Sequence, residues 1–138
     1  MLKTVLLFAL ASSLAACSLF EGQPEYSGPS DYAYTLSVGC FCLVTGPLRI
    51  TVQGGVVTRV EELSVRESDD PIVDDILAER SITLVELGAL VRRARLTADA
   101  VEVEYDPTYG FPASVSIDYE RNATDDEIRY TVTDYTPL

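Results

Sequence analysis

The sequence predicts a single α+β domain over residues 32–138, with a six-stranded antiparallel sheet and two helices packed on one of its faces. Apolar and polar residues alternate with a period of two in six short segments, three on each side of a helical middle. The middle segment repeats apolar residues at helical spacing, and turns rich in Gly, Pro and Asp separate the strands. The elements follow one another as β-β-β-α-α-β-β-β, with one main helix and one short helix.

Residues 1–16 have the pattern of a secretory signal peptide, which is removed from the mature protein. Lys3 precedes an apolar run that is too short to span a bilayer. The segment Leu14-Ala15-Ala16-Cys17 then resembles the lipobox of bacterial lipoproteins, which implies cleavage before Cys17 and lipidation of that cysteine. An ordinary signal peptide would also end in small residues, and the cysteine directly after them favours the lipoprotein.

Lipidation of Cys17 implies that the mature chain is held at a membrane of the cell envelope. Each buried methylene contributes about 0.8 kcal/mol, so two or more acyl chains hold a protein stably where one does not. Ser18 follows the cysteine in place of Asp. By resemblance to the sorting pattern of enteric bacteria, this favours the outer membrane, facing the periplasm, over the inner membrane. Residues 17–31 are rich in Gly, Pro and Ser without periodicity, which predicts a flexible tether.

The first predicted strand, from residue 32 to 42, carries Cys40 and Cys42 on its apolar face. In an oxidising compartment two remaining cysteines suggest a disulfide. Residues two apart in a regular strand place their Cβ atoms too far apart for one, so a bridge requires the chain to leave the strand here. Buried thiols, or a redox or soft-metal function, are the alternatives, although no histidine is present to complete a copper(I) site.

The second and third strands form a hairpin around two glycines. A three-residue loop with Gly55 left-handed sets Val52 opposite Val56 and Leu48 opposite Val60, which keeps the shared face apolar. A two-residue loop would instead place charged residues opposite that face. The sequence therefore predicts the three-residue loop.

Two helices follow. Asp70 as a cap and Pro71 at the first helical position predict a short helix over residues 71–79. Thr83 and Glu86 form a capping box that begins the main helix. The acids around the start of the short helix lack the spacing of a calcium loop and fit solvated caps that favour the helix dipole.

Three arginines, Arg92, Arg93 and Arg95, crowd the last turn of the main helix. Cations there complement the helix dipole, and an anion site is the alternative. Gly88 in the middle of this helix predicts a close approach to the sheet.

Three strands are predicted in the second half, over residues 101–105, 113–119 and 128–133. The turn after the first of them holds Asp106, Tyr109 and Phe111, which we take as a candidate interaction loop with exposed aromatic rings. The alternatives are that Asp106 only caps the turn and that the tyrosines belong to the core.

Three segments carry a resemblance to a known family. They are Cys40-Phe41-Cys42 with Gly46-Pro47-Leu48-Arg49-Ile50-Thr51-Val52, then Val103-Glu104-Tyr105-Asp106-Pro107-Thr108-Tyr109-Gly110-Phe111-Pro112, and finally Ile128 to Val132. These segments resemble a bacterial family that is known as a domain of unknown function, numbered 6174. Its members are often lipoproteins and have no assigned activity, so the resemblance implies a fold and a location and no chemistry.

The composition narrows the classes of function. A formal net charge of −12 argues against binding of nucleic acid, and the lack of histidine removes Ser-His and Cys-His catalysis. No cofactor and no metal site is predicted. We therefore expect a non-catalytic binding or interaction module that is anchored to the membrane and has a possible envelope protein partner. Thiol redox or soft-metal handling through Cys40 and Cys42 is one alternative, and a carboxylate-based hydrolase is another.

Overall fold

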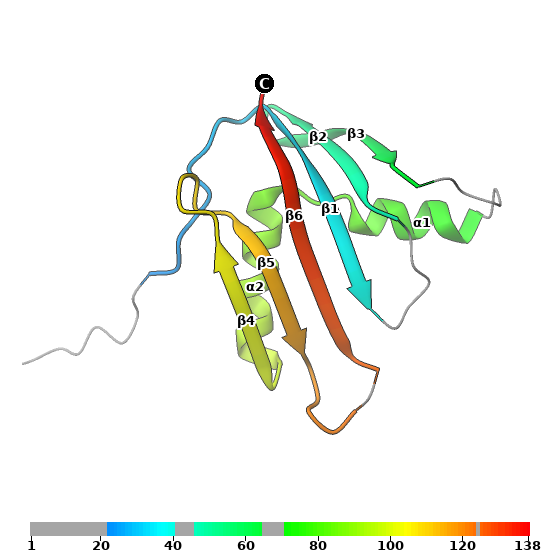
Figure 1. The fold of residues 1–138 in the computed structure, drawn as a ribbon, viewed down its shortest axis with the longest axis vertical. Helices are drawn as coiled ribbons and strands as arrows, with labels where there is room; N and C mark the ends of the chain where they lie inside the picture. The colour runs from blue at the N-terminus through cyan, green and yellow to red at the C-terminus, as the bar shows by residue number, and fades with distance from the viewer. Residues whose placement is uncertain (1–21, 41–45, 65–70, 124) are drawn as a thin grey trace, which may run out of the picture.

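The computed structural model describes residues 22–40, 46–64, 71–123 and 125–138. Six strands form one antiparallel sheet, and two helices lie between the third and fourth strands along the chain (Figure 1). In space the strands are ordered β3-β2-β1-β6-β5-β4. The elements are β1 (Tyr32–Cys40), β2 (Leu48–Gln53), β3 (Val56–Glu62), α1 (Pro71–Arg80), α2 (Leu84–Thr97), β4 (Ala100–Tyr105), β5 (Pro112–Asp118) and β6 (Glu127–Pro137).

The predicted fold class is wrong in how large a part of the domain it assigns to the helices and in where it places them. The domain is a β-rich α+β fold in which the sheet dominates, with one short helix and one longer helix. The order of strands in the sheet differs from their order along the chain, because β1 pairs with β6 at the centre. Among the described elements, α2 is the helix whose backbone comes close to strands, namely β4 and β5. The helix α1 reaches the core through Leu77 near its end.

The core lies under the centre of the sheet, where β1 contributes most. Tyr32, Tyr34 and Leu36 point to one face and are at most 1% exposed. They pack with the apolar residues of β2 and with the first turn of α2. A second cluster joins the later turns of α2 to β5, and Tyr130 of β6 packs against both clusters. The two clusters contain Leu48, Ile50, Val52, Leu84, Leu87, Phe111 and Val132 in the first and Val91, Ala94, Val115 and Ile117 in the second.

The hairpin between β2 and β3 has a two-residue turn, so the predicted three-residue loop is wrong. Both glycines of the turn have positive φ, at +59° and +78°, and Gln53 pairs with Val56. A bulge then inserts one extra residue, Thr58, into β3. As a result Ile50 lies opposite Val60 and Val52 opposite Val57, whereas Leu48 lies opposite Glu62. The bulge thus keeps two of the three pairs apolar without the longer loop that was predicted.

The main helix begins where the sequence predicts. Thr83 Oγ1 accepts from the backbone N–H of Glu86 at 3.1 Å, and the backbone N–H of Thr83 donates to the Glu86 carboxylate at 2.7 Å. The capping box is thus confirmed. The close approach predicted at Gly88 is wrong, because a Cβ there would meet only the Arg92 side chain at 3.6 Å. In the described part of the chain, no helix is long and apolar enough to cross a membrane.

Two tyrosine hydroxyls of β1 hold the connection between the helices. The Tyr34 hydroxyl donates to the carbonyl oxygen of Ile82, and the Tyr32 hydroxyl accepts from the backbone N–H of Leu84 at 3.0 Å. The N–H of Leu84 belongs to the first turn of α2, where no helical carbonyl can pair with it. The tyrosines of the sheet therefore provide hydrogen-bond partners for a backbone carbonyl and a backbone N–H that have none within the turn between the helices.

A bulge in β6 turns Tyr135 toward the core. Thr35 lies opposite Thr133 and Ala33 opposite Thr136, so two residues of β6, Asp134 and Tyr135, face one residue of β1. Asp134 has a φ of +51°, the left-handed conformation that one type of bulge places at its first residue. The displaced register brings the Tyr135 ring within 4.9–6.4 Å of four other aromatic rings, those of Tyr26, Tyr32, Tyr109 and Phe111.

Residues 24–31, here called the N-terminal arm, lie against the domain. The backbone N–H of Ser27 donates to the carbonyl of Tyr109 at 2.8 Å, and the Tyr26 hydroxyl lies 2.8 Å from that of Tyr135. Asp31 Oδ1 accepts from the backbone N–H of Gly54 at 2.7 Å. This part of the predicted flexible tether is therefore docked on the domain. Residues 17–21 of the predicted tether lie outside the described residues.

Candidate functional site

The predicted interaction loop is an ordered turn whose aromatic rings pack inward. Asp106 Oδ1 accepts from the backbone N–H groups of Thr108 at 3.0 Å and Tyr109 at 2.7 Å, so Asp106 caps the turn. Phe111 is only 3% exposed and belongs to the core, which contradicts the expected exposed ring. Tyr109 is half-buried, with its ring 4.9 Å from that of Tyr135. An interaction through this loop stays a prediction.

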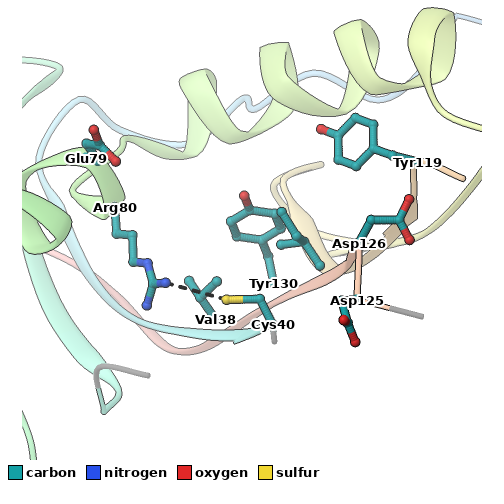
Figure 2. A pocket seen from close by; sticks show the side chains of 9 residues that line it. Val38, Cys40, Glu79, Arg80, Tyr119, Asp125, Asp126 and Tyr130 are labelled. Carbon is teal, nitrogen blue, oxygen red and sulfur yellow. Dashed lines mark hydrogen bonds between the residues drawn. The ribbon is translucent and has the colours of Figure 1, made fainter. Parts of the chain in front are cut away.

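At the other end of β5 the molecule has a cleft of about 450 Å³. Its walls come from the end of α1, the end of β1, and the connection from β5 into β6 (Figure 2). The side chains around it are chemically mixed, with one cation, three carboxylates, a sulfur, two phenols and two aliphatic groups. They belong to Val38, Cys40, Glu79, Arg80, Tyr119, Asp125, Asp126, Ile128 and Tyr130.

The fold places the cation of the cleft by ending α1 at Arg80. The backbone N–H of Ser81 turns back to the carbonyl of Ala78 at 3.2 Å, and the next residue, Ile82, is held by Tyr34. From this position Arg80 Nη2 reaches across to Cys40 Sγ at 3.5 Å, as Figure 2 shows. Cys40 is the last residue of β1 and pairs with Ile128. One wall of the cleft thus combines a guanidinium with a sulfur.

Tyr130 occupies the middle of the cleft in Figure 2, between Arg80 and the side chains of Tyr119 and Asp126. Burial raises the pKa of Tyr130, Tyr119 raises it further, and the positive charge of Arg80 lowers it. The net shift is upward, so the phenol is neutral at physiological pH. A neutral phenol can both donate and accept a hydrogen bond to a polar molecule in the cleft.

Asp126 forms the wall opposite Arg80. Its Oδ2 is buried and finds no hydrogen-bond donor among the residues that the structure describes. A buried carboxylate oxygen without a donor loses its hydration with no compensation, which destabilises the protein by about 1–3 kcal/mol or more. An oxygen of this kind in the wall of a cleft is a ready acceptor for a donor that enters from outside.

The three carboxylates of the cleft do not converge. In Figure 2, Glu79 lies on the far side of Arg80 from Asp126, and the side chains of Asp125 and Asp126 point in different directions. Within the described residues, no group of three or more Cys, Asp or Glu side chains is close enough to hold a metal ion. The arrangement suits recognition of separate groups on one molecule better than a pair of carboxylates acting on one bond.

Sequence reasoning found only part of this cleft. Cys40 lines it, whereas the predicted partner Cys42 and the predicted lipidation site Cys17 lie outside the described residues. A disulfide between Cys40 and Cys42 therefore stays a prediction. Arg80 and Asp126 were missed as a pair. No local motif marks them, because α1 and the β5–β6 connection are far apart in the sequence and line one cleft only in the folded domain.

Comparison with known proteins gives a family but no activity. Residues 24–137 match the family described as a family of unknown function, DUF6174. The matched segment begins at the N-terminal arm and ends with β6. It therefore covers both the cleft and the group of aromatic rings around Tyr135, here called the aromatic cluster. Neither a curated protein nor a solved structure matches the chain.

Proposed function

The chain belongs to this family of unknown function, DUF6174, and we propose that it is a lipid-anchored protein of the cell envelope that binds a small dipolar ligand. The lipobox-like segment Leu14-Ala15-Ala16-Cys17 supports the anchor, with the outer membrane facing the periplasm as the proposed location. The cleft supports binding without catalysis. The observation that carries the binding proposal is the buried Oδ2 of Asp126, opposite Arg80 and without a donor in the described residues.

The ligand class follows from the two ends of the cleft. Asp126 offers a carboxylate to an ammonium or another charged donor, and hydrogen bonds between charged partners are about twice as strong as neutral ones. At the wall opposite Asp126, the guanidinium of Arg80 can bind an anionic group of the ligand. Tyr130 lies between them, and Val38 and Ile128 provide apolar surface. A short aliphatic chain with an amine at one end and a carboxylate at the other matches this order of groups.

A titration followed by NMR tests the binding proposal. The mature chain with Cys17→Ser, labelled with ¹⁵N, is titrated with ω-amino acids of increasing length and with the matching alkylamines and alkanoates. We expect shifts of the backbone amides at Cys40, Tyr119, Ile128 and Tyr130, and tighter binding of the ω-amino acids than of either half. No shift at these four amides with any probe contradicts the proposal.

Two neighbouring aspartates provide a matched control. Asp126→Asn keeps the shape of the side chain but removes its charge, and we expect it to weaken binding at least tenfold. Asp125→Asn changes the exposed neighbour by the same chemistry, and we expect less than a twofold effect. Equal losses in the two variants would point to the general acidity of the loop and away from the cleft.

The position of Cys40 in the cleft supports a second candidate function, which is thiol redox or soft-metal handling with Cys42. Arg80 Nη2 donates to Cys40 Sγ at 3.5 Å, so a cation lies against the sulfur that such chemistry would use. A double variant, Cys40→Ser with Cys42→Ser, separates the two proposals. Unchanged binding of the ω-amino acids and an unchanged cellular phenotype would exclude the redox and metal functions.

A further inference from the structure

The outer side of α2 combines exposed apolar side chains with cations. Val85 is 57% exposed and Leu96 is 86% exposed. Helical spacing places Ala89, Arg92 and Arg93 on the same side, opposite the buried residues of α2. Both arginines are exposed. We call this surface, with Arg95 at its border, the outer face of α2.

Among the described residues, Arg92, Arg93 and Arg95 form no ion pair with a carboxylate, whereas Arg59 and Arg129 do. Glu25 lines a hollow beside Arg92 without forming an ion pair with it. The nearest acids along the chain are already engaged, because Glu86 closes the capping box and Asp99 accepts from a backbone N–H at 3.2 Å. Three of the nine arginines of the mature chain therefore lie together on an otherwise acidic molecule.

The N-terminal arm runs beside this same face. Pro24, Glu25 and Tyr26 form a small hollow with Val85, Gly88 and Arg92. One step nearer the N-terminus, the Gln23 carboxamide, with its oxygen toward α2, accepts from Arg95 Nη1 at 2.8 Å and Nε at 2.9 Å. Only residues 18–22 separate Gln23 from Cys17, and a chain of this length spans at most about 22 Å. A lipid on Cys17 would therefore hold the membrane within reach of the outer face.

We propose that the outer face of α2 docks on the headgroups of anionic phospholipids in the membrane that carries the anchor, a step that rests on the proposed lipidation of Cys17. Arginine binds phosphate oxygens with two parallel hydrogen bonds, and Leu96 and Val85 enter the headgroup layer beside them. The face reverses the local sign of a molecule whose net charge is −12, so it selects one orientation.

The chain contains no tryptophan, so a single introduced tryptophan reports on one position. The lipidated Leu96→Trp protein is placed in vesicles that contain brominated lipids, with either phosphatidylcholine alone or added phosphatidylglycerol. We expect at least a twofold quenching of the fluorescence of the introduced tryptophan in the anionic vesicles, and less than half of this effect in neutral ones. Salt at high concentration should remove the difference, because it screens surface charges.

Two comparisons make the test specific. Leu63→Trp reports from an exposed site just past β3, at the sheet edge opposite β4, and we expect no quenching there. Replacing Arg92, Arg93 and Arg95 together by Gln should abolish the quenching at position 96. The docking proposal is wrong if the protein is on the vesicles but the tryptophan at position 96 is not quenched. It is also wrong if this quenching depends neither on the lipid charge nor on the three arginines. Protein that fails to stay on the vesicles at all overturns the lipid anchor instead.

Discussion

Single hydroxyl groups fix how the helices attach to the sheet. The Tyr34 side chain is fully buried, and its hydroxyl donates to the carbonyl of Ile82 in the turn between α1 and α2. Because that turn also sets the position of Arg80, the same hydroxyl supports one wall of the cleft. A residue that the sequence indicates only as an apolar strand position thus has a polar role.

Tyr34→Phe should lower the free energy of unfolding by about 1–3 kcal/mol, because it leaves the Ile82 carbonyl without its donor. Urea unfolding of the mature chain measures this difference. Tyr119→Phe is the matched control: Tyr119 is 38% exposed, and we expect a loss below about 0.5 kcal/mol. Equal losses in the two variants would show that the Tyr34 hydroxyl has no structural role.

The tyrosines also predict how stability depends on pH. Burial raises the pKa of Tyr34, and burial likewise is the main cause that raises the pKa of Tyr32 and Tyr130. In the unfolded chain these phenols ionise near pH 10, whereas in the folded protein they stay neutral to higher pH. Folding stability is therefore fully present below about pH 10 and falls as the pH rises above it.

Urea unfolding between pH 8 and pH 11.5 tests this dependence. We expect a constant free energy of unfolding up to about pH 9.5 and a steady fall above pH 10, with a shallower fall in Tyr34→Phe. An identical slope in the variant would mean that Tyr34 titrates alike in the folded and unfolded states.

At the scale of elements, bulges decide which side chains reach the core. A strict alternation along β6 would put Tyr135 on the face opposite Val132, yet the bulge at Asp134 brings Tyr135 into the aromatic cluster. In the β2–β3 hairpin, the extra residue Thr58 likewise restores Val60 to a position opposite Ile50. Periodicity predicts the strands but not these insertions, because a bulge is chosen by the packing of both neighbours.

Substitutions at Asp134 test the bulge of β6. Its φ of +51° is unfavourable for a β-branched residue, so Asp134→Val should lower the free energy of unfolding by about 1–2 kcal/mol. Asp134→Gly adopts this conformation without a steric cost, and we expect it to change stability by less than about 0.5 kcal/mol. Thermal unfolding of the two variants provides the comparison. A valine variant as stable as the glycine variant would contradict the conformation of this bulge.

The capping box of α2 could be predicted because its partners lie three residues apart, and the structure has it at Thr83 and Glu86. The expectation at Gly88 failed because the sequence does not distinguish a glycine in close contact with a neighbouring element from a glycine without such a contact. Local chemistry therefore predicts where the longer helix begins, whereas its packing depends on residues elsewhere in the chain.

At the scale of the whole molecule, the sequence could not predict what comes together across the sheet. The aromatic loop was expected to be exposed, but the N-terminal arm lies over it, with Tyr26 against Phe111 and Ser27 bonded to Tyr109. The composition of the arm resembles that of a linker, so its docking is visible only in three dimensions. The same holds for the cleft, since Arg80 and Asp126 line opposite walls of it although they lie far apart in the sequence.

The proposed anchor would give these separate features one arrangement. A lipid on Cys17 would place the arm and the outer face of α2 beside the membrane. The cleft lies at the end of β5 away from the arm, with walls from α1, β1 and the β5–β6 connection. In this proposed arrangement the outer face of α2 faces lipid, and the cleft stays open to the surrounding compartment.

Metabolic labelling with palmitate tests the proposed lipid anchor most directly, in cells that express either the natural chain or Cys17→Ser. We expect the natural protein to carry the label and to fractionate with membranes, and the Cys17→Ser variant to carry no label and to leave the membrane fraction. A natural chain without label, or a Cys17→Ser chain that is still labelled and still sediments with membranes, would contradict the lipid anchor and the orientation proposed from it.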